Sequence, residues 1–216
     1  NGLKTRAHVF QLHGFLRAAR TDLDRANLLA EYLPVDVQDR RLIVADINIR
    51  LLALDILDSN YAAARRRVES LLQTDLNPHM LISVYRHQLH LESSEAGASL
   101  HRRTFSPPYA ARYESALNEL LQQVDAAPSQ AYVSIADTVV ASAVRVGDVT
   151  AVEAALRIAE RSQFKAAANV VDRFGSRLRV ASTLAALQDL KEIRLPPAPH
   201  PLRLRGVVPA SIKYSL

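Results

Sequence analysis

The sequence predicts an all-α fold of stacked antiparallel helical hairpins, and three observations predict it. Ala, Leu, Val and Arg dominate the 216 residues, whereas aromatic residues make up 6% and Gly only 6 positions. This composition favours helix over sheet. An apolar frame with steps of three, four and three residues recurs along the chain and matches one face of a helix. Pro closes several copies of the frame, where a helix has to end.

The clearest copy of this frame begins at Tyr61 and continues through Ala64, Val68 and Leu71, and it ends before Pro78. Because these side chains share one helical face, the segment is predicted to be the second helix of a hairpin. The frame recurs at Leu23, Ala26, Ala30 and Leu33 before Pro34, at Tyr113, Ala116 and Leu120 before Pro128, and at Val149, Val152, Leu156 and Ala159 after Gly147-Asp148.

Each copy is preceded by another helical stretch, which we expect to be the first helix of its pair. These stretches span residues 6–17, 41–57, 79–91 and 130–145. The third pair is separated by a polar segment of about residues 93–108, which contains Gly97 and Pro107-Pro108 and is predicted to be an insertion loop. Two more helices, at about 164–173 and 177–193, would cap a helical-repeat domain of residues 1–194. The Pro-rich residues 195–216 are predicted to form an extended tail.

Small residues stand where paired helices would cross: Gly14 late in a first helix, and Ala26, Ala64 and Ala116 early in second helices. With Tyr61 and Tyr113 after the inter-helix turns, Gly147-Asp148 as a turn, and the terminating prolines, the chain resembles a tetratricopeptide-repeat array over about 160 residues. It departs from that family in having no Trp. The resemblance implies a TPR-like α-solenoid whose first helices line an inner curved face that binds a peptide or protein.

The partner-binding candidates are the polar residues that we place on the first helices: Gln11, Arg17, Asn48, Arg50, Arg86 and His87. Some tetratricopeptide domains hold a peptide's terminal carboxylate with Lys and Asn on these helices, and here Asn48 is the only residue of the right type. The alternative for Arg50 is an ion pair with Asp46, four residues earlier on the same helix.

Metal binding and catalysis have less support in the sequence than binding of a peptide or protein. His87 and His90 lie three residues apart with Glu92 nearby, a spacing that two metal ligands can share, but no further carboxylate completes the set on that helix. The chain has no Cys and no Gly-x-Ser-x-Gly sequence, and its few Gly residues are scattered. We therefore expect a non-enzymatic adaptor or scaffold with no catalytic residues, no metal and no cofactor.

The charge leaves two alternatives open. The formal net charge is +5, and nearly all the positive charge is Arg, with clusters at 40–41, 65–67, 102–103, 203 and 205. Arg-mediated nucleic-acid binding is one alternative, although the triplet at 65–67 is predicted to be a solvated outer face. A peptide- or ligand-sensing regulatory domain of a larger transcriptional regulator is the other. No apolar run is long enough to span a membrane, no signal peptide is visible, and a cytoplasmic location is favoured.

Overall fold

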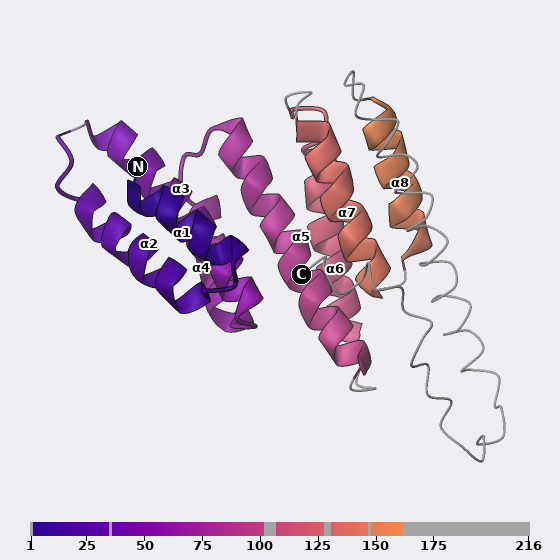
Figure 1. Ribbon diagram of the computed structural model, residues 1–216. Helices are drawn as coiled ribbons and strands as arrows, with labels where there is room; N and C mark the ends of the chain where they lie inside the picture. Colours follow the sequence, from indigo (N-terminus) through magenta and orange to yellow (C-terminus); the bar gives the residue numbers. More distant parts are fainter. Residues whose placement is uncertain (1, 35, 102–106, 128–130, 147, 162–216) are drawn as a thin grey trace, which may run out of the picture.

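The computed structural model describes residues 2–34, 36–101, 107–127, 131–146 and 148–161. Within these ranges the chain forms eight helices and no strand, so the all-α prediction is confirmed there (Figure 1). The predicted helices at 164–193 and the tail at 195–216 lie outside the described residues. The helices are α1 (Gly2–Leu12), α2 (Leu16–Ala30), α3 (Val37–Leu57), α4 (Tyr61–Leu72), α5 (Pro78–His101), α6 (Pro107–Gln122), α7 (Tyr132–Val146) and α8 (Val149–Glu160).

Four of the helices begin at an Asp or Asn that caps them. The side-chain oxygens of Asp36, Asn60, Asn77 and Asp148 each accept a hydrogen bond from the backbone N–H three residues later, at 2.8 to 3.4 Å. Such a cap satisfies one of the free N–H groups of the first turn and contributes about 1 kcal/mol. Asn77 is followed by Pro78 at the first helical position, where the missing N–H costs nothing.

The turn after α1 corrects the prediction for Gly14. This residue lies outside the helix with a φ of 77°, and a Cβ placed on it would meet no atom within 4 Å. The N–H of Phe15 donates to the carbonyl of Phe10 at 2.8 Å, and that of Gly14 to Gln11 at 3.1 Å, which is the Schellman arrangement. Glycine therefore serves the left-handed turn here, and not a close crossing of two helices.

Helix α3 ends in the same arrangement, with Ser59 in the left-handed position at a φ of 59°. The N–H of Asn60 donates to the carbonyl of Asp55 at 2.8 Å. A side chain in this conformation costs about 1–2 kcal/mol, whereas glycine loses up to about 1 kcal/mol more entropy on folding. Ser59→Gly should therefore raise the free energy of unfolding by about 0.5 kcal/mol in urea titrations. Ser59→Ala, which keeps the Cβ, should gain nothing, and equal midpoints for the two variants would contradict this account.

The helices pack as consecutive pairs, α1 with α2, α3 with α4, α5 with α6 and α7 with α8. Helices α3 and α5 have a further role, because each contributes to two cores. In α3, Leu51 and Leu54 pack with α1 and α2, while Leu52 and Ile56 pack with α4 and α5. A helix that is apolar on two faces has to lie between neighbours. In Figure 1 the pairs accordingly follow one another across the molecule.

Helix α5 repeats this pattern and links the two halves of the molecule. Its residues Val84 and Leu91 join the core with α3 and α4, and its residues Ile82 and Leu89 join the core with α6, α7 and α8. It contacts both α3 and α7, which are first helices of their pairs (Figure 1). In the described part of the chain, no helix has the length and apolar character needed to cross a bilayer.

Helix α5 also corrects the predicted insertion loop at 93–108. It continues to His101, so residues 93–101 are helical, and Pro107 begins α6 instead of closing a loop. Ala96 in this extension is fully buried. Glu92 and Glu95 pair with Arg65 on α4 and Arg112 on α6. The weak helix preference of the Ser and Gly residues is thus outweighed by tertiary contacts.

Candidate interaction site between helices α3, α5 and α7

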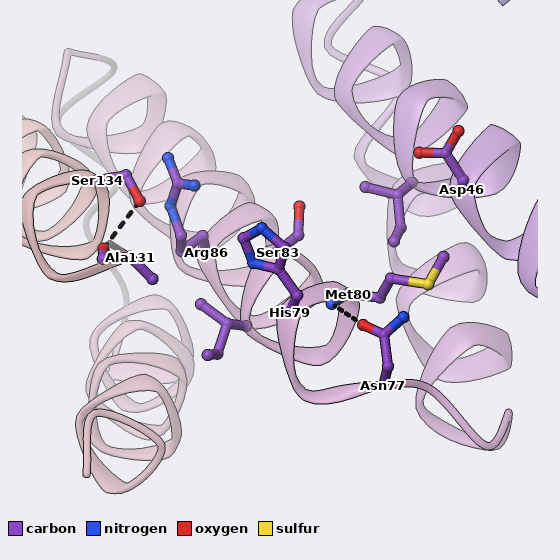
Figure 2. Close-up of a pocket in the computed structure, with 10 residues that line it drawn as sticks. Asp46, Asn77, His79, Met80, Ser83, Arg86, Ala131 and Ser134 are labelled. Carbon is purple, nitrogen blue, oxygen red and sulfur yellow. Dashed lines mark hydrogen bonds between the residues drawn. The ribbon is translucent and has the colours of Figure 1, made fainter. Parts of the chain in front are cut away.

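A cleft of about 280 Å³ lies where three first helices meet, α3, α5 and α7 (Figure 2). Its apolar lining comes from Ile49 of α3 and from Met80 and Ile82 of α5. Figure 2 shows Arg86 and Ser134 on the α7 side and Met80 on the side of α3. Its polar lining consists of Asp46, Asn77, His79, Ser83, Arg86 and Ser134. The cleft can thus receive an apolar and a charged group together.

Two of the polar side chains that line the cleft already form hydrogen bonds with backbone groups close to them in the sequence. The Asn77 Oδ1 atom caps α5 by accepting from the N–H of Met80 at 2.9 Å. The Ser134 hydroxyl donates to the carbonyl of Ala131 at 2.9 Å (Figure 2).

The carboxylate of Asp46 is also engaged, by two cations. Its Oδ2 atom lies 2.8 Å from the ammonium of Lys4 on α1 and 3.4 Å from the Nε of Arg50. The ion-pair alternative for Arg50, with an acid four residues earlier, is therefore confirmed. Arg50 lines neither this cleft nor the one between α3 and α4.

Arg86 is different, because its guanidinium has no acidic partner among the described residues. Its Nε donates to the Thr138 hydroxyl at 2.9 Å, and that hydroxyl in turn donates to the carbonyl of Ser134 at 2.9 Å. Within the described ranges no carboxylate lies within 4 Å of it. Burial lowers the pKa of Arg86, and the more distant Asp137 raises it. The guanidinium is thus held by one hydroxyl and forms no ion pair with any described carboxylate.

Arg145 on α7 repeats this arrangement with the roles of the helices exchanged. Its Nη1 lies 3.5 Å from the Ser93 hydroxyl of α5, which donates to the carbonyl of His90 at 3.0 Å. Burial lowers the pKa of Arg145, with Tyr61 acting in the opposite direction. No described carboxylate pairs with it either. The contact between α5 and α7, called the α5–α7 seam from here on, therefore holds two half-buried cations, Arg86 and Arg145, and among the described residues each is anchored by a neutral hydroxyl.

Two histidines of α5, His87 and His90, add no charge to this seam at neutral pH. The Nδ1–H of His87 donates to the carbonyl of Ser83 at 2.7 Å, and burial lowers the pKa of His87. Burial, Arg145 and His87 together lower the pKa of His90 to about 4. Across the described residues, no three His, Asp or Glu side chains gather as metal ligands would.

The remaining candidates lie elsewhere. Asn48 of α3 donates to the carbonyl of Val44 at 2.9 Å and accepts from Arg67 at 2.5 Å, so both ends of its amide are engaged. It lines a second cleft of about 640 Å³ between α3 and α4. Arg17 is exposed on α2, a second helix, which corrects its placement on a first helix. Gln11 is half-buried on α1 and lines neither cleft.

Of the residues that line the three-helix cleft, Arg86 was predicted as a partner-binding residue, and most of the others were not. Arg145 lies outside this lining and was not predicted either, although it is the one basic residue of helix α7. His79, Ser83 and Ser134 left no signal in the sequence, since small polar residues occur on any helix surface.

Comparisons of the chain with family models, curated proteins and solved structures found no match. Its function is therefore argued from its own residues.

Proposed function

We propose that this chain is a non-enzymatic binding module, in which TPR-like stacked hairpins present the cleft between α3, α5 and α7 to a peptide or protein segment. The observation that carries the proposal is the origin of the cleft walls, which come from the first helices of three successive pairs. A segment lying across these helices would contact each pair in turn. Arrays of paired helices use such surfaces for binding.

The dimensions and lining of the cleft support a peptide over a small molecule. Its volume of about 280 Å³ lies at or below the lower end of the roughly 300–1,000 Å³ range of small-molecule pockets. It suits one or two side chains of a longer segment. Met80 adapts its shape to different apolar partners, and Ile49 and Ile82 complete the apolar floor.

The test is to fill the cleft and measure the loss of a ligand. Peptides are first selected from a displayed random library with the purified full chain, and the affinity of a selected peptide is then measured by fluorescence anisotropy. Ser83→Phe places a ring in the cleft at a half-buried position. We expect it to weaken binding at least about tenfold, since the space for a buried side chain is lost.

The matched control is Ser70→Phe, which adds the same ring at an exposed position of the second cleft. It should leave the affinity within about twofold of the parent chain. If Ser70→Phe removes binding and Ser83→Phe does not, the three-helix cleft is not the site. Circular dichroism of both variants shows that each change leaves the helices intact.

A further inference from the structure

The arginines of this chain fall into two groups according to their partners. Most half-buried arginines between helices are neutralised: Arg65 and Arg112 by Glu92 and Glu95, and Arg67 by Asp55. Arg86 and Arg145 are half-buried too, yet each donates only to a hydroxyl, and neither forms an ion pair within the part of the chain that the structure describes. A charge removed from water without a counter-charge is costly.

The two exceptions lie on the same seam and are held in the same way. Arg86 extends from α5 to Thr138 on α7, and Arg145 extends from α7 to Ser93 on α5. The hydroxyls of Thr138 and Ser93 each donate their proton to a carbonyl of their own helix, at 2.9 and 3.0 Å. The hydroxyl oxygen is therefore left to accept a hydrogen bond from the arginine. The guanidinium groups are therefore oriented before any ligand arrives, which lowers the entropic cost of binding.

We infer that Arg86 and Arg145 are a two-point anchor for an acidic peptide segment that enters the cleft and runs along the α5–α7 seam. The inference rests on the proposed function and names the chemistry of its partner. Among the described residues neither arginine has an ion-pair partner. The carboxylates of Asp or Glu side chains in the peptide would supply the negative charges that pair with them. Arg86 lines the cleft itself, so an acidic residue bound to it places a neighbouring apolar residue near Met80.

The spacing of the two arginines defines the segment. Thr138 and Arg145 stand two helical turns apart on α7, as Arg86 and Ser93 do on α5, which corresponds to about 10 Å along the seam. Side chains of an extended chain alternate between its two faces, so residues that share a face are about 7 Å apart at two positions and about 13 Å apart at four. The long side chains of Arg and Glu span the difference from about 10 Å, and the favoured ligand carries two acidic residues four positions apart, with an apolar residue beside the first.

A peptide is favoured over nucleic acid because none of the described residues that line the cleft is Phe, Tyr or Trp. Single-stranded nucleic acid is usually held by stacking of its bases on aromatic side chains as well as by positive charge. Along the seam the two cations alternate with neutral histidines, and His90 has a pKa of about 4. Two isolated charges match a pair of carboxylates better than a continuous row of phosphates.

The experiment uses the full chain and a fluorescent synthetic peptide with two Glu four positions apart and Leu beside the first. Its companion has Gln in place of both Glu. We expect the Glu peptide to bind at least about tenfold more tightly than the Gln peptide. Arg86→Met and Arg145→Met, which keep the aliphatic stem, should each weaken the Glu peptide about tenfold and leave the Gln peptide unchanged. The matched control is Arg66→Met, which removes a charge from an exposed position of α4 and should change neither affinity.

A second measurement separates binding from a structural role. Removal of an unpaired, half-buried charge should leave the melting temperature equal or higher, whereas removal of a structural arginine lowers it. Equal affinity for both peptides, no binding of the Glu peptide, or an equal effect of Arg66→Met overturns the inference. So does a single-stranded oligonucleotide that displaces the Glu peptide and itself depends on Arg86. Selected peptides that depend on Ser83 but lack acidic residues overturn the inference alone, whereas ligands insensitive to Ser83→Phe overturn the proposed function as well.

Discussion

Replacement of Asp55 by Ala is expected to lower the free energy of unfolding by about 3 kcal/mol. The Asp55 side chain is 1% exposed, and its two oxygens lie 2.8 Å from Arg20 on α2 and 3.0 Å from Arg67 on α4. One carboxylate on α3 thus joins three helices. Its loss leaves two half-buried guanidinium groups without this partner, and the cost of an uncompensated charge then appears in full. Urea denaturation followed by circular dichroism measures the change.

The control for this prediction is Asp58→Ala. Asp58 pairs with the same Arg20 at 3.0 Å, but its side chain is 39% exposed. Water and salt screen such a pair, so its loss should cost no more than about 1 kcal/mol. Similar losses for Asp55→Ala and Asp58→Ala would show that the buried position of Asp55 adds nothing. An intermediate loss for Asp55→Asn would separate the charge from the hydrogen bond.

The faces of the second helices could be predicted from the sequence because their signal is local. Ala64, Val68 and Leu71 are all buried, as the steps of three and four residues indicate. Helix ends were harder, because competing signals meet there. Gly14 was placed in a helix on its size, yet the structure uses it for a positive φ. Composition does not distinguish these two uses of glycine.

Ion pairs between helices could not be predicted, because they depend on which elements become neighbours. The triplet at 65–67 was predicted to be a solvated face, which is wrong for two of its members. Arg65 pairs with Glu92, and Arg67 with Asp55, while Arg66 is exposed. Arg65 and Arg112 also pair with Glu95, which lies in the segment 93–101 that is helical where the sequence indicated a loop. Only the three-dimensional arrangement brings these charges together.

The candidate site was predictable to the same limited extent. Arg50 and Arg86 are both arginines on the polar side of a first helix, and the sequence already offered Asp46 as an ion-pair partner for Arg50. The structure confirms this pair, whereas among the described residues Arg86 forms no ion pair and donates to a hydroxyl of α7. An arginine is available to a ligand only where its neighbours leave its charge uncompensated. Whether the charge of an arginine is compensated depends on how the helices pack around it, and not on the residue type alone.

The second large effect is expected from His90 as the pH falls. Its pKa is lowered to about 4 from 6.5 by burial, by Arg145 and by His87. The folded chain therefore keeps this ring neutral, whereas the unfolded chain protonates it below about pH 6.5. The contribution of His90 to stability is fully present above that pH, and it is lost as the pH falls toward 4. The loss amounts to about 3 kcal/mol. Urea titrations at pH 7 and at pH 4 should therefore differ much less in His90→Gln than in the parent chain, since glutamine does not titrate.

The exposed His13, in the turn between α1 and α2, provides the matched control, and His13→Gln should keep the pH dependence of the parent chain. If the free energy of unfolding falls equally between pH 7 and pH 4 in the parent chain and in His90→Gln, protonation of His90 does not cause the loss of stability. The pKa of His90 also depends on the charge of Arg145, which belongs to the proposed peptide anchor. A carboxylate bound beside Arg145 would offset the cation that lowers the pKa of His90. At about pH 5 and above, where its carboxylates stay mostly ionised, the Glu peptide should therefore raise the pKa of His90 in the parent chain, and it should raise it less in Arg145→Met.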